Sequence, residues 1–133
     1  MDLIKITPDN EKARSILKMT ELIEERINNQ DRKKMGALIT ADYYEILKEL
    51  ITAVLLMDGY KTLIHRDLIE YLREKYKEFS SYELSFLDDL RVLRNRISYE
   101  GFFIEPSYLG RNEPLLKSLI LKLKKLANGK LEK

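Results

Sequence analysis

The sequence predicts an all-α protein, an up-and-down antiparallel bundle of about five helices. Apolar residues recur at spacings of three and four along five long segments, and this is the period of an amphipathic helix. Short connections separate the segments, so that consecutive helices are expected to pack as antiparallel neighbours. No segment combines alternating apolar and polar residues with a hairpin turn, and we therefore expect no β-strand.

The composition is that of one globular domain, which we expect to cover residues 1–133. Hydrophobic residues make up 44% of the chain and charged residues 35%, enough apolar material for a packed core. No apolar run approaches the roughly 20 residues of a transmembrane helix. No signal sequence opens the chain, so a soluble cytoplasmic protein without membrane contact is expected.

The numbers of cysteine, histidine and charged residues restrict which metal and RNA sites the chain can form. The chain has no cysteine and a single histidine, His65. Thiolate metal sites and sites with two imidazoles from one chain are excluded, and we expect neither metal nor cofactor. Lysine and arginine exceed aspartate and glutamate only by 24 to 22, so any binding of RNA would depend on a local basic cluster. Tyr43, Tyr44 and Tyr60 either seal helix interfaces or line a groove on which bases stack.

Capping residues and apolar faces predict the first two helices. Thr7 is the expected N-cap of the first helix, with Pro8 in the first helical position, where its missing N–H is not needed. A basic stretch, residues 32–34, follows this helix. The second helix is expected from about Thr40 to Gly59, because glycine ends helices in the left-handed conformation. Its wide apolar face predicts that it is the central helix.

Three further helices follow. One is expected over residues 63–79. The Ser-x-x-Glu spacing of residues 80–83 is a capping box, which begins the fourth helix, and Gly101 ends it. Residues 102–112 are expected to form a loop packed by its phenylalanines, and residues 114–127 the last helix.

The end of the fourth helix is the most informative stretch for function. Three arginines, Arg91, Arg94 and Arg96, fall within six residues. Arg91 and Arg94 are three apart, and Arg94 and Ser98 four apart, so these pairs lie on one face. Arg94 lies beside the predicted core stripe. Its guanidinium either pairs with carboxylates and the helix dipole, or binds an anion such as phosphate through parallel N–H donors.

The order of the motifs resembles the HEPN family, the higher-eukaryote and prokaryote nucleotide-binding domain. The resemblance spans nearly the whole chain and is greatest to stand-alone archaeal and bacterial members. It implies a helical bundle that forms a homodimer, with the motif helices of two protomers around one cleft. The residues that carry the resemblance are Tyr43-Tyr44, Gly59-Tyr60-Lys61 with His65 soon after, and Leu93-Arg94-Asn95-Arg96.

Active members of this family are metal-independent endoribonucleases with an Arg-polar-x-x-x-His motif. The resemblance therefore assigns Arg94 and Asn95 to catalytic positions and places Tyr99 where the motif has histidine. Tyrosine, with a pKa of about 10, is a poorer base than histidine, with a pKa of about 6.5, so we expect weak or lost activity. The further candidates for contacts with RNA or a nucleotide are Arg91, Arg96, Ser98 and His65.

Three functions remain open on the sequence. The first is a homodimer that binds RNA or a nucleotide at a cleft around Arg94 and Asn95. The second is an interaction module or toxin–antitoxin subunit paired with a nucleotidyltransferase, with Tyr99 as the modified residue. The third is a structural adapter whose arginines are committed to ion pairs within the chain.

Overall fold

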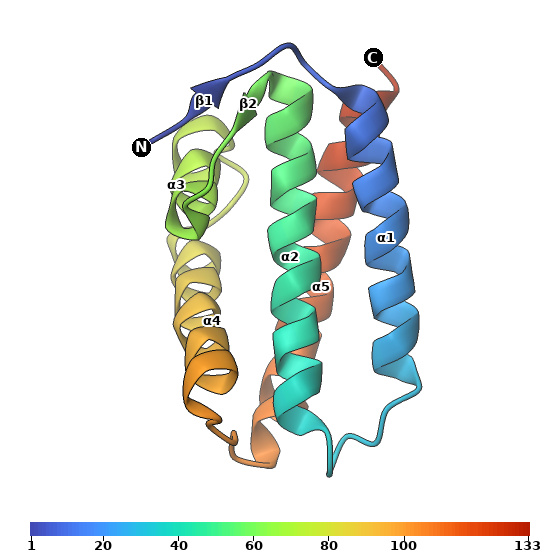
Figure 1. Cartoon of the computed structure of the whole chain (residues 1–133), viewed down its shortest axis with the longest axis vertical. Coiled ribbons are helices and arrows are strands. Elements are labelled where there is room, and N and C mark those ends of the chain that lie inside the picture. The colour runs from blue at the N-terminus through green and yellow to red at the C-terminus, as the bar shows by residue number, and fades with distance from the viewer.

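Five helices and one pair of short strands make up the computed structural model of the chain, which describes all 133 residues (Figure 1). The helices are α1 (Asn10–Asn28), α2 (Gly36–Asp58), α3 (His65–Lys75), α4 (Ser81–Glu100) and α5 (Ser107–Leu131). The strands β1 (Ile4–Lys5) and β2 (Tyr60–Lys61) pair antiparallel. The predicted all-α bundle is confirmed.

Helix α2 lies at the centre of the bundle. In Figure 1, α1 lies on one side of α2, α3 and α4 lie on the other, and α5 lies behind it. The four long helices α1, α2, α4 and α5 alternate in direction. Because α2 packs against every other helix, the prediction of a central second helix is confirmed. None of the five helices is long and apolar enough to cross a membrane.

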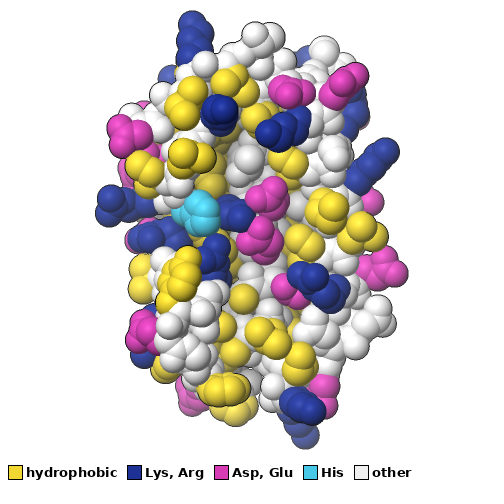
Figure 2. Space-filling model, in the orientation of Figure 1, with side chains coloured by type: hydrophobic (Ala, Val, Ile, Leu, Met, Phe, Trp, Pro, Cys, Tyr) yellow, Lys and Arg dark blue, Asp and Glu magenta, His cyan; other side chains and the backbone are white.

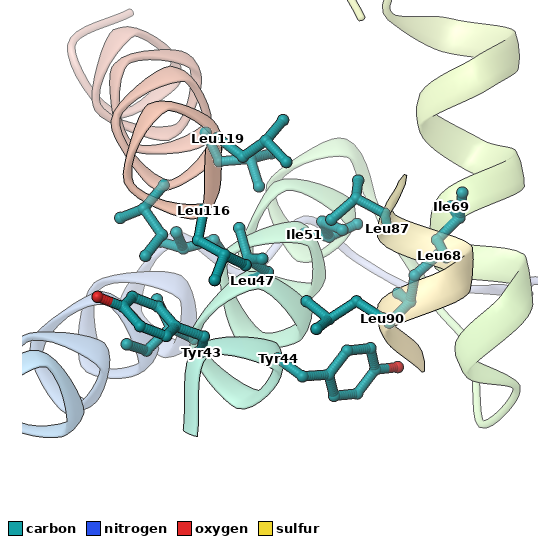
Figure 3. Close-up of a cluster of buried hydrophobic side chains, with 14 of the residues drawn as sticks. Tyr43, Tyr44, Leu47, Ile51, Leu68, Ile69, Leu87, Leu90, Leu116 and Leu119 are labelled. Atoms are coloured by element: carbon teal, nitrogen blue, oxygen red, sulfur yellow. The ribbon is translucent and has the colours of Figure 1, made fainter. Parts of the chain in front are cut away.

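Two adjacent tyrosines show how α2 fills the core on both of its sides. Tyr43 and Tyr44 point in opposite directions, Tyr43 away from α4 and Tyr44 toward it (Figure 3). Both rings are buried, and the Tyr43 hydroxyl donates a hydrogen bond of 2.5 Å to Glu113 of α5. Tyr60 is partly buried against the same core. These rings seal helix interfaces, and none of them stands free in solvent as a stacking platform.

The first helix begins later than the sequence predicts. Asp9, not Thr7, is the N-cap of α1, and its Oδ1 accepts a hydrogen bond of 3.0 Å from the N–H of Lys12. Aspartate caps a helix at least as well as threonine. The prediction for Thr7 and Pro8 was therefore wrong, and both residues lie outside the helix.

The segment before α1 is extended because it is bound to the end of α2. The N–H groups of Ile6 and Asp9 donate to the carbonyls of Gly59 and Leu56, at 2.9 Å in each case. The two-residue strands continue this contact and are too short to show an alternating pattern, so the expectation of no strand was wrong here. Gly59 ends α2 as predicted, with φ of 91°. A Cβ at this position would lie 3.1 Å from the Ile6 carbonyl oxygen, so the contact requires glycine.

Two other helices differ from their predicted lengths. α2 begins at Gly36, earlier than Thr40, because Asp31 organises a preceding turn by accepting hydrogen bonds from two following backbone N–H groups. α3 is shorter than the predicted 63–79. It ends at Lys75, because the next residue, Tyr76, has an extended backbone, and the Tyr76 hydroxyl donates a 2.6 Å hydrogen bond to Asp58 of α2.

The start and end of α4 follow the predicted signals. The capping box of Ser80 and Glu83 is present with both of its hydrogen bonds, and Gly101 ends the helix with φ of 65°. The predicted loop over residues 102–112 is wrong in its second half, because α5 begins at Ser107 and places Leu109 in the core. Of the two phenylalanines expected to pack this loop, Phe102 is partly buried, whereas Phe103 is 82% exposed and does not pack as predicted.

Candidate functional site

An open groove of about 510 Å³ lies between the start of α3 and the second half of α4. In Figure 2 the only histidine of the chain is visible among lysine and arginine side chains on this face of the molecule. The groove brings together five of the seven residues that the sequence predicts for the site. The lining residues are Leu63, Ile64, His65, Arg66, Arg91, Arg94, Asn95 and Tyr99.

Helix α4 presents four of these side chains at helical spacing. Arg91, Arg94, Asn95 and Tyr99 follow one another at intervals of three, one and four residues, so they lie along one side of the helix. The buried Ile97 lies on the side that faces the core. The core contacts of α4 therefore fix which side of the helix faces the groove.

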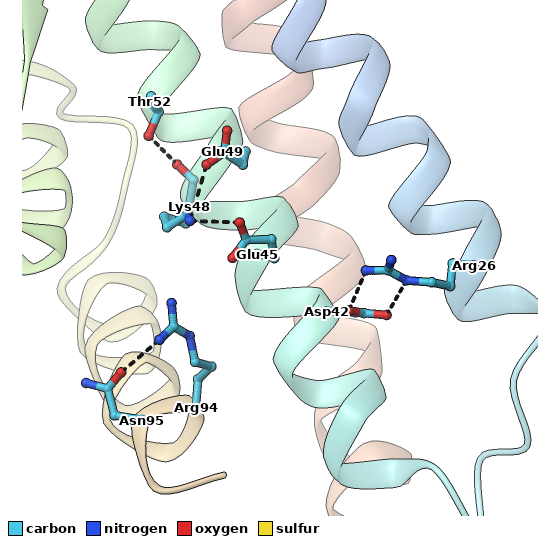
Figure 4. Close-up of polar contacts among 8 residues, drawn as sticks. All are labelled: Arg26, Asp42, Glu45, Lys48, Glu49, Thr52, Arg94 and Asn95. Carbon is cyan, nitrogen blue, oxygen red and sulfur yellow. Dashed lines mark hydrogen bonds and ion pairs between the residues drawn. The ribbon is translucent and has the colours of Figure 1, made fainter. Parts of the chain in front are cut away.

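The Arg94 guanidinium has no carboxylate partner in the chain. It takes part in none of the ion pairs. Its Nη1 donates a hydrogen bond of 3.1 Å to Oδ1 of Asn95 (Figure 4), and its Cζ lies 5.0 Å from the centroid of the Tyr44 ring. A cation over an aromatic face is held in place without being neutralised. Most of its N–H donors thus remain unpaired beside the groove.

The neighbouring cations differ in how they are paired. Arg91 forms an ion pair of 3.0 Å with Asp88, one turn earlier on α4. Arg66 lines the groove at the start of α3 without an ion pair. On α2, Lys48 is paired with both Glu45 and Glu49, at 2.7 and 3.3 Å (Figure 4), and these carboxylates neutralise it. The positive charge available to a ligand therefore comes from arginines of α3 and α4.

His65 is the first residue of α3 and is partly buried. Its ring centroid lies 6.2 Å from that of Tyr44, the same ring on which Arg94 rests. Burial lowers the pKa of His65, and the nearby cations of Lys48 and Arg94 lower it further. The imidazole is therefore neutral at pH 7, so one ring nitrogen is able to accept a proton.

The Tyr44 ring contacts both His65 and Arg94 from the core side of the groove. It is almost fully buried, and burial raises its pKa to about 12, although the arginines of α4 act in the opposite direction. Tyr44 therefore stays protonated and uncharged across the physiological range. It serves as a rigid support between the imidazole on α3 and the guanidinium on α4.

Two predicted residues do not line the groove. Arg96 lies with its Cζ 3.8 Å from the centroid of the Phe102 ring, and Ser98 is exposed outside the lining residues. The sequence analysis missed Arg66 and the apolar pair Leu63 and Ile64. The sequence did contain an indication for Leu63 and Ile64: these two apolar residues directly precede the predicted site residue His65, and they therefore lie beside it.

A second cavity, of about 320 Å³, lies between α1, α2 and α5. Lys124 in its lining is paired with Glu24, and the hydroxyl of Tyr43 is bonded to Glu113 of α5. Lys117 is the one lining cation without an ion pair, so this cavity offers a ligand less free charge than the groove between α3 and α4. Nowhere in the chain do three or more His, Asp or Glu side chains lie together so that they could hold a metal ion.

The chain was compared with models of protein families, with curated proteins and with solved structures. None of them matches it.

Proposed function

We propose that the chain binds RNA in the groove between α3 and α4, with a phosphate of the RNA against Arg94. The single observation that carries this proposal is the Arg94 guanidinium, which has no carboxylate partner and borders an open groove. Guanidinium binds phosphate through two parallel hydrogen bonds. Arg66 lies on the same groove without an ion pair and supplies a second positive charge for an adjacent phosphate, whereas Arg91, also on the groove, is already paired with Asp88.

The rim of the groove supports a nucleotide ligand rather than a free phosphate ion. Leu63 is 86% exposed and Ile64 is also exposed, and both line the groove beside the arginines. Apolar side chains next to phosphate-binding groups suit the base and ribose of an RNA strand. This ligand also agrees with the cytoplasmic location expected from the sequence.

A homodimer would complete this site, in keeping with the resemblance to HEPN proteins. Tyr99 is 78% exposed and Leu63 is 86% exposed, and both line the groove. A second copy of the chain that packed against these side chains would bury them and deepen the groove. Sedimentation equilibrium of the purified chain tests this part of the proposal, and a single species of monomer mass would contradict it.

Replacing Arg94 by alanine is expected to weaken RNA binding about tenfold to a hundredfold. A hydrogen bond to a charged group contributes about 1.5–3 kcal/mol, and 1.4 kcal/mol corresponds to about a tenfold change in Kd. Fluorescence anisotropy with a labelled single-stranded RNA measures the effect. The slope of log K against log salt should also become less negative by about 0.7, the contribution of one phosphate contact on a single strand.

Arg14→Ala is the matched control for this experiment. Arg14 is exposed on α1, which lies on the other side of α2 from α4 (Figure 1). We expect this control to bind RNA like the wild type. Equal losses in R94A and R14A would show that binding follows total charge, and the proposed site would then be rejected.

A second candidate function rests on the exposure of Tyr99. Its hydroxyl forms no hydrogen bond within the chain and is accessible at the groove. It could therefore be the residue modified by a nucleotidyltransferase partner in a toxin–antitoxin system. Mass measurement of the chain from its native cells, followed by fragmentation, tests this function. A nucleotidyl group on Tyr99 would support it, and uniformly unmodified Tyr99 would count against it.

A further inference from the structure

His65 and Arg94 share one groove although they come from different helices. His65 begins α3, and Arg94, Asn95 and Tyr99 belong to α4, yet all four line the same open space. The Tyr44 ring lies 6.2 Å from the imidazole and 5.0 Å from the guanidinium carbon. Because both groups pack beside one buried ring, the core contacts of α3 and α4 hold them in the same groove.

The two candidates for proton transfer in this groove are positioned very differently. Tyr99 is largely exposed and has no hydrogen-bond partner in the chain, so nothing holds its hydroxyl against a bound phosphate. His65 is partly buried at the start of a helix that packs against both α2 and α4. A proton-transfer group must be held within hydrogen-bond reach of the reacting atom. Neither side chain forms a hydrogen bond within the chain, but the imidazole is held by its partial burial and its contact with the Tyr44 ring, so it is the better positioned of the two.

We propose that His65 is the catalytic proton acceptor in an RNA-cleaving reaction at this groove. This inference rests on the RNA binding proposed above. His65 then acts as the base of the site, a role that Tyr99 does not fill. This base comes from α3 of the same chain, and thus from outside the helix that carries Arg94.

The reaction needs no reactant besides RNA and water. The ribose 2′-oxygen attacks the adjacent phosphorus, and its proton passes to the imidazole of His65. The bond between phosphorus and the 5′-oxygen then breaks, and the leaving oxygen takes a proton from water or from the imidazolium. The products are a 2′,3′-cyclic phosphate and a 5′-hydroxyl. Arg94 and Arg91 stabilise the negative charge on the phosphoryl oxygens as it develops.

The surroundings of His65 favour the neutral base. Its burial and the excess of positive charge around it lower its pKa, so the imidazole is ready to accept a proton near neutral pH. The cleavage rate should therefore fall in acid with a midpoint below the ordinary histidine value of about 6.5. The charged and titratable groups that face it are Tyr44, Glu45 and Lys48 of α2, Arg91 and Arg94 of α4, and Arg66 of its own helix.

The test measures cleavage and binding of the same RNA by identically prepared variants in buffer with a chelator. We expect H65A and H65Q to slow cleavage by about 10²- to 10⁴-fold, the usual contribution of a general base, with Kd changed less than about threefold. Y99F should lose less than about tenfold, and R14A should cleave like the wild type. An oligonucleotide with deoxyribose at the cleaved position should bind and remain intact. Circular dichroism verifies that both His65 variants are folded.

Each outcome separates this inference from the proposed function. Wild-type protein that binds RNA without cleaving it would overturn the role of His65 and leave the binding site standing. Cleavage by H65A or H65Q at the wild-type rate, or a loss in Y99F as large as that in H65A, would do the same. Protein that does not bind RNA would overturn the binding proposal itself, and the inference with it.

Discussion

Replacing Leu47 by alanine is expected to lower the free energy of unfolding by about 2–5 kcal/mol. The Leu47 side chain is 1% exposed and lies in the core next to Leu116 of α5 (Figure 3). Alanine would remove apolar contacts and leave a cavity at the place where the central helix meets its neighbours, because the surrounding helices relax only partly. Urea unfolding followed by far-UV circular dichroism measures the loss.

A leucine on the surface provides the control for Leu47. Leu22 of α1 is 58% exposed, so Leu22→Ala should change the free energy of unfolding by less than about 0.5 kcal/mol. If the two substitutions cost the same, the core is not arranged around α2 as described.

Replacing Asp58 by alanine is expected to cost about 3 kcal/mol of stability. Asp58, the last residue of α2, accepts hydrogen bonds of 2.6 Å from the hydroxyls of Tyr71 and Tyr76. It also forms an ion pair with Lys130 of α5. The substitution would leave two phenols and an ammonium group without their partner in a partly buried place, and each unsatisfied group costs about 1–3 kcal/mol. Asp89→Ala, at an exposed position of α4, is the matched control and should have little effect.

The contribution of Asp58 should depend on pH in a defined direction. Burial alone would raise the pKa of this carboxyl group, but the hydrogen bonds from Lys130, Tyr71 and Tyr76 outweigh burial and lower it. A lowered pKa means that the stabilisation is fully present above the unfolded value of about 3.9. It is lost as the pH falls through the folded pKa.

Asp58→Asn tests this pH dependence, because asparagine keeps the shape and removes the charge. The difference in unfolding free energy between wild type and D58N should be largest near pH 7. It should shrink as the pH falls below about 4, where the wild-type carboxyl group of the unfolded chain is itself protonated. A difference that stays constant between pH 7 and pH 3 would contradict the role of the charge. Urea unfolding at several pH values measures it.

The sequence by itself determined those features that depend on neighbouring residues. The Ser80 and Glu83 capping box, the left-handed Gly59 and Gly101, and the apolar face that makes α2 central all follow from local hydrogen bonding and helical periodicity. The same periodicity places Arg91, Arg94, Asn95 and Tyr99 along one side of α4. A helix repeats its geometry every few residues, so these relations require no knowledge of the rest of the chain.

Only the tertiary structure decided the features that depend on distant residues. α1 begins at Asp9 because the segment before it is bound to the far end of α2, and α5 begins early because Leu109 reaches the core. His65 joins Arg94 because α3 and α4 pack together over Tyr44, while Arg96 turns away to Phe102. Contacts between residues far apart in the sequence have no period along the chain, and the packing of the helices alone brings the imidazole and the unpaired guanidinium into one groove.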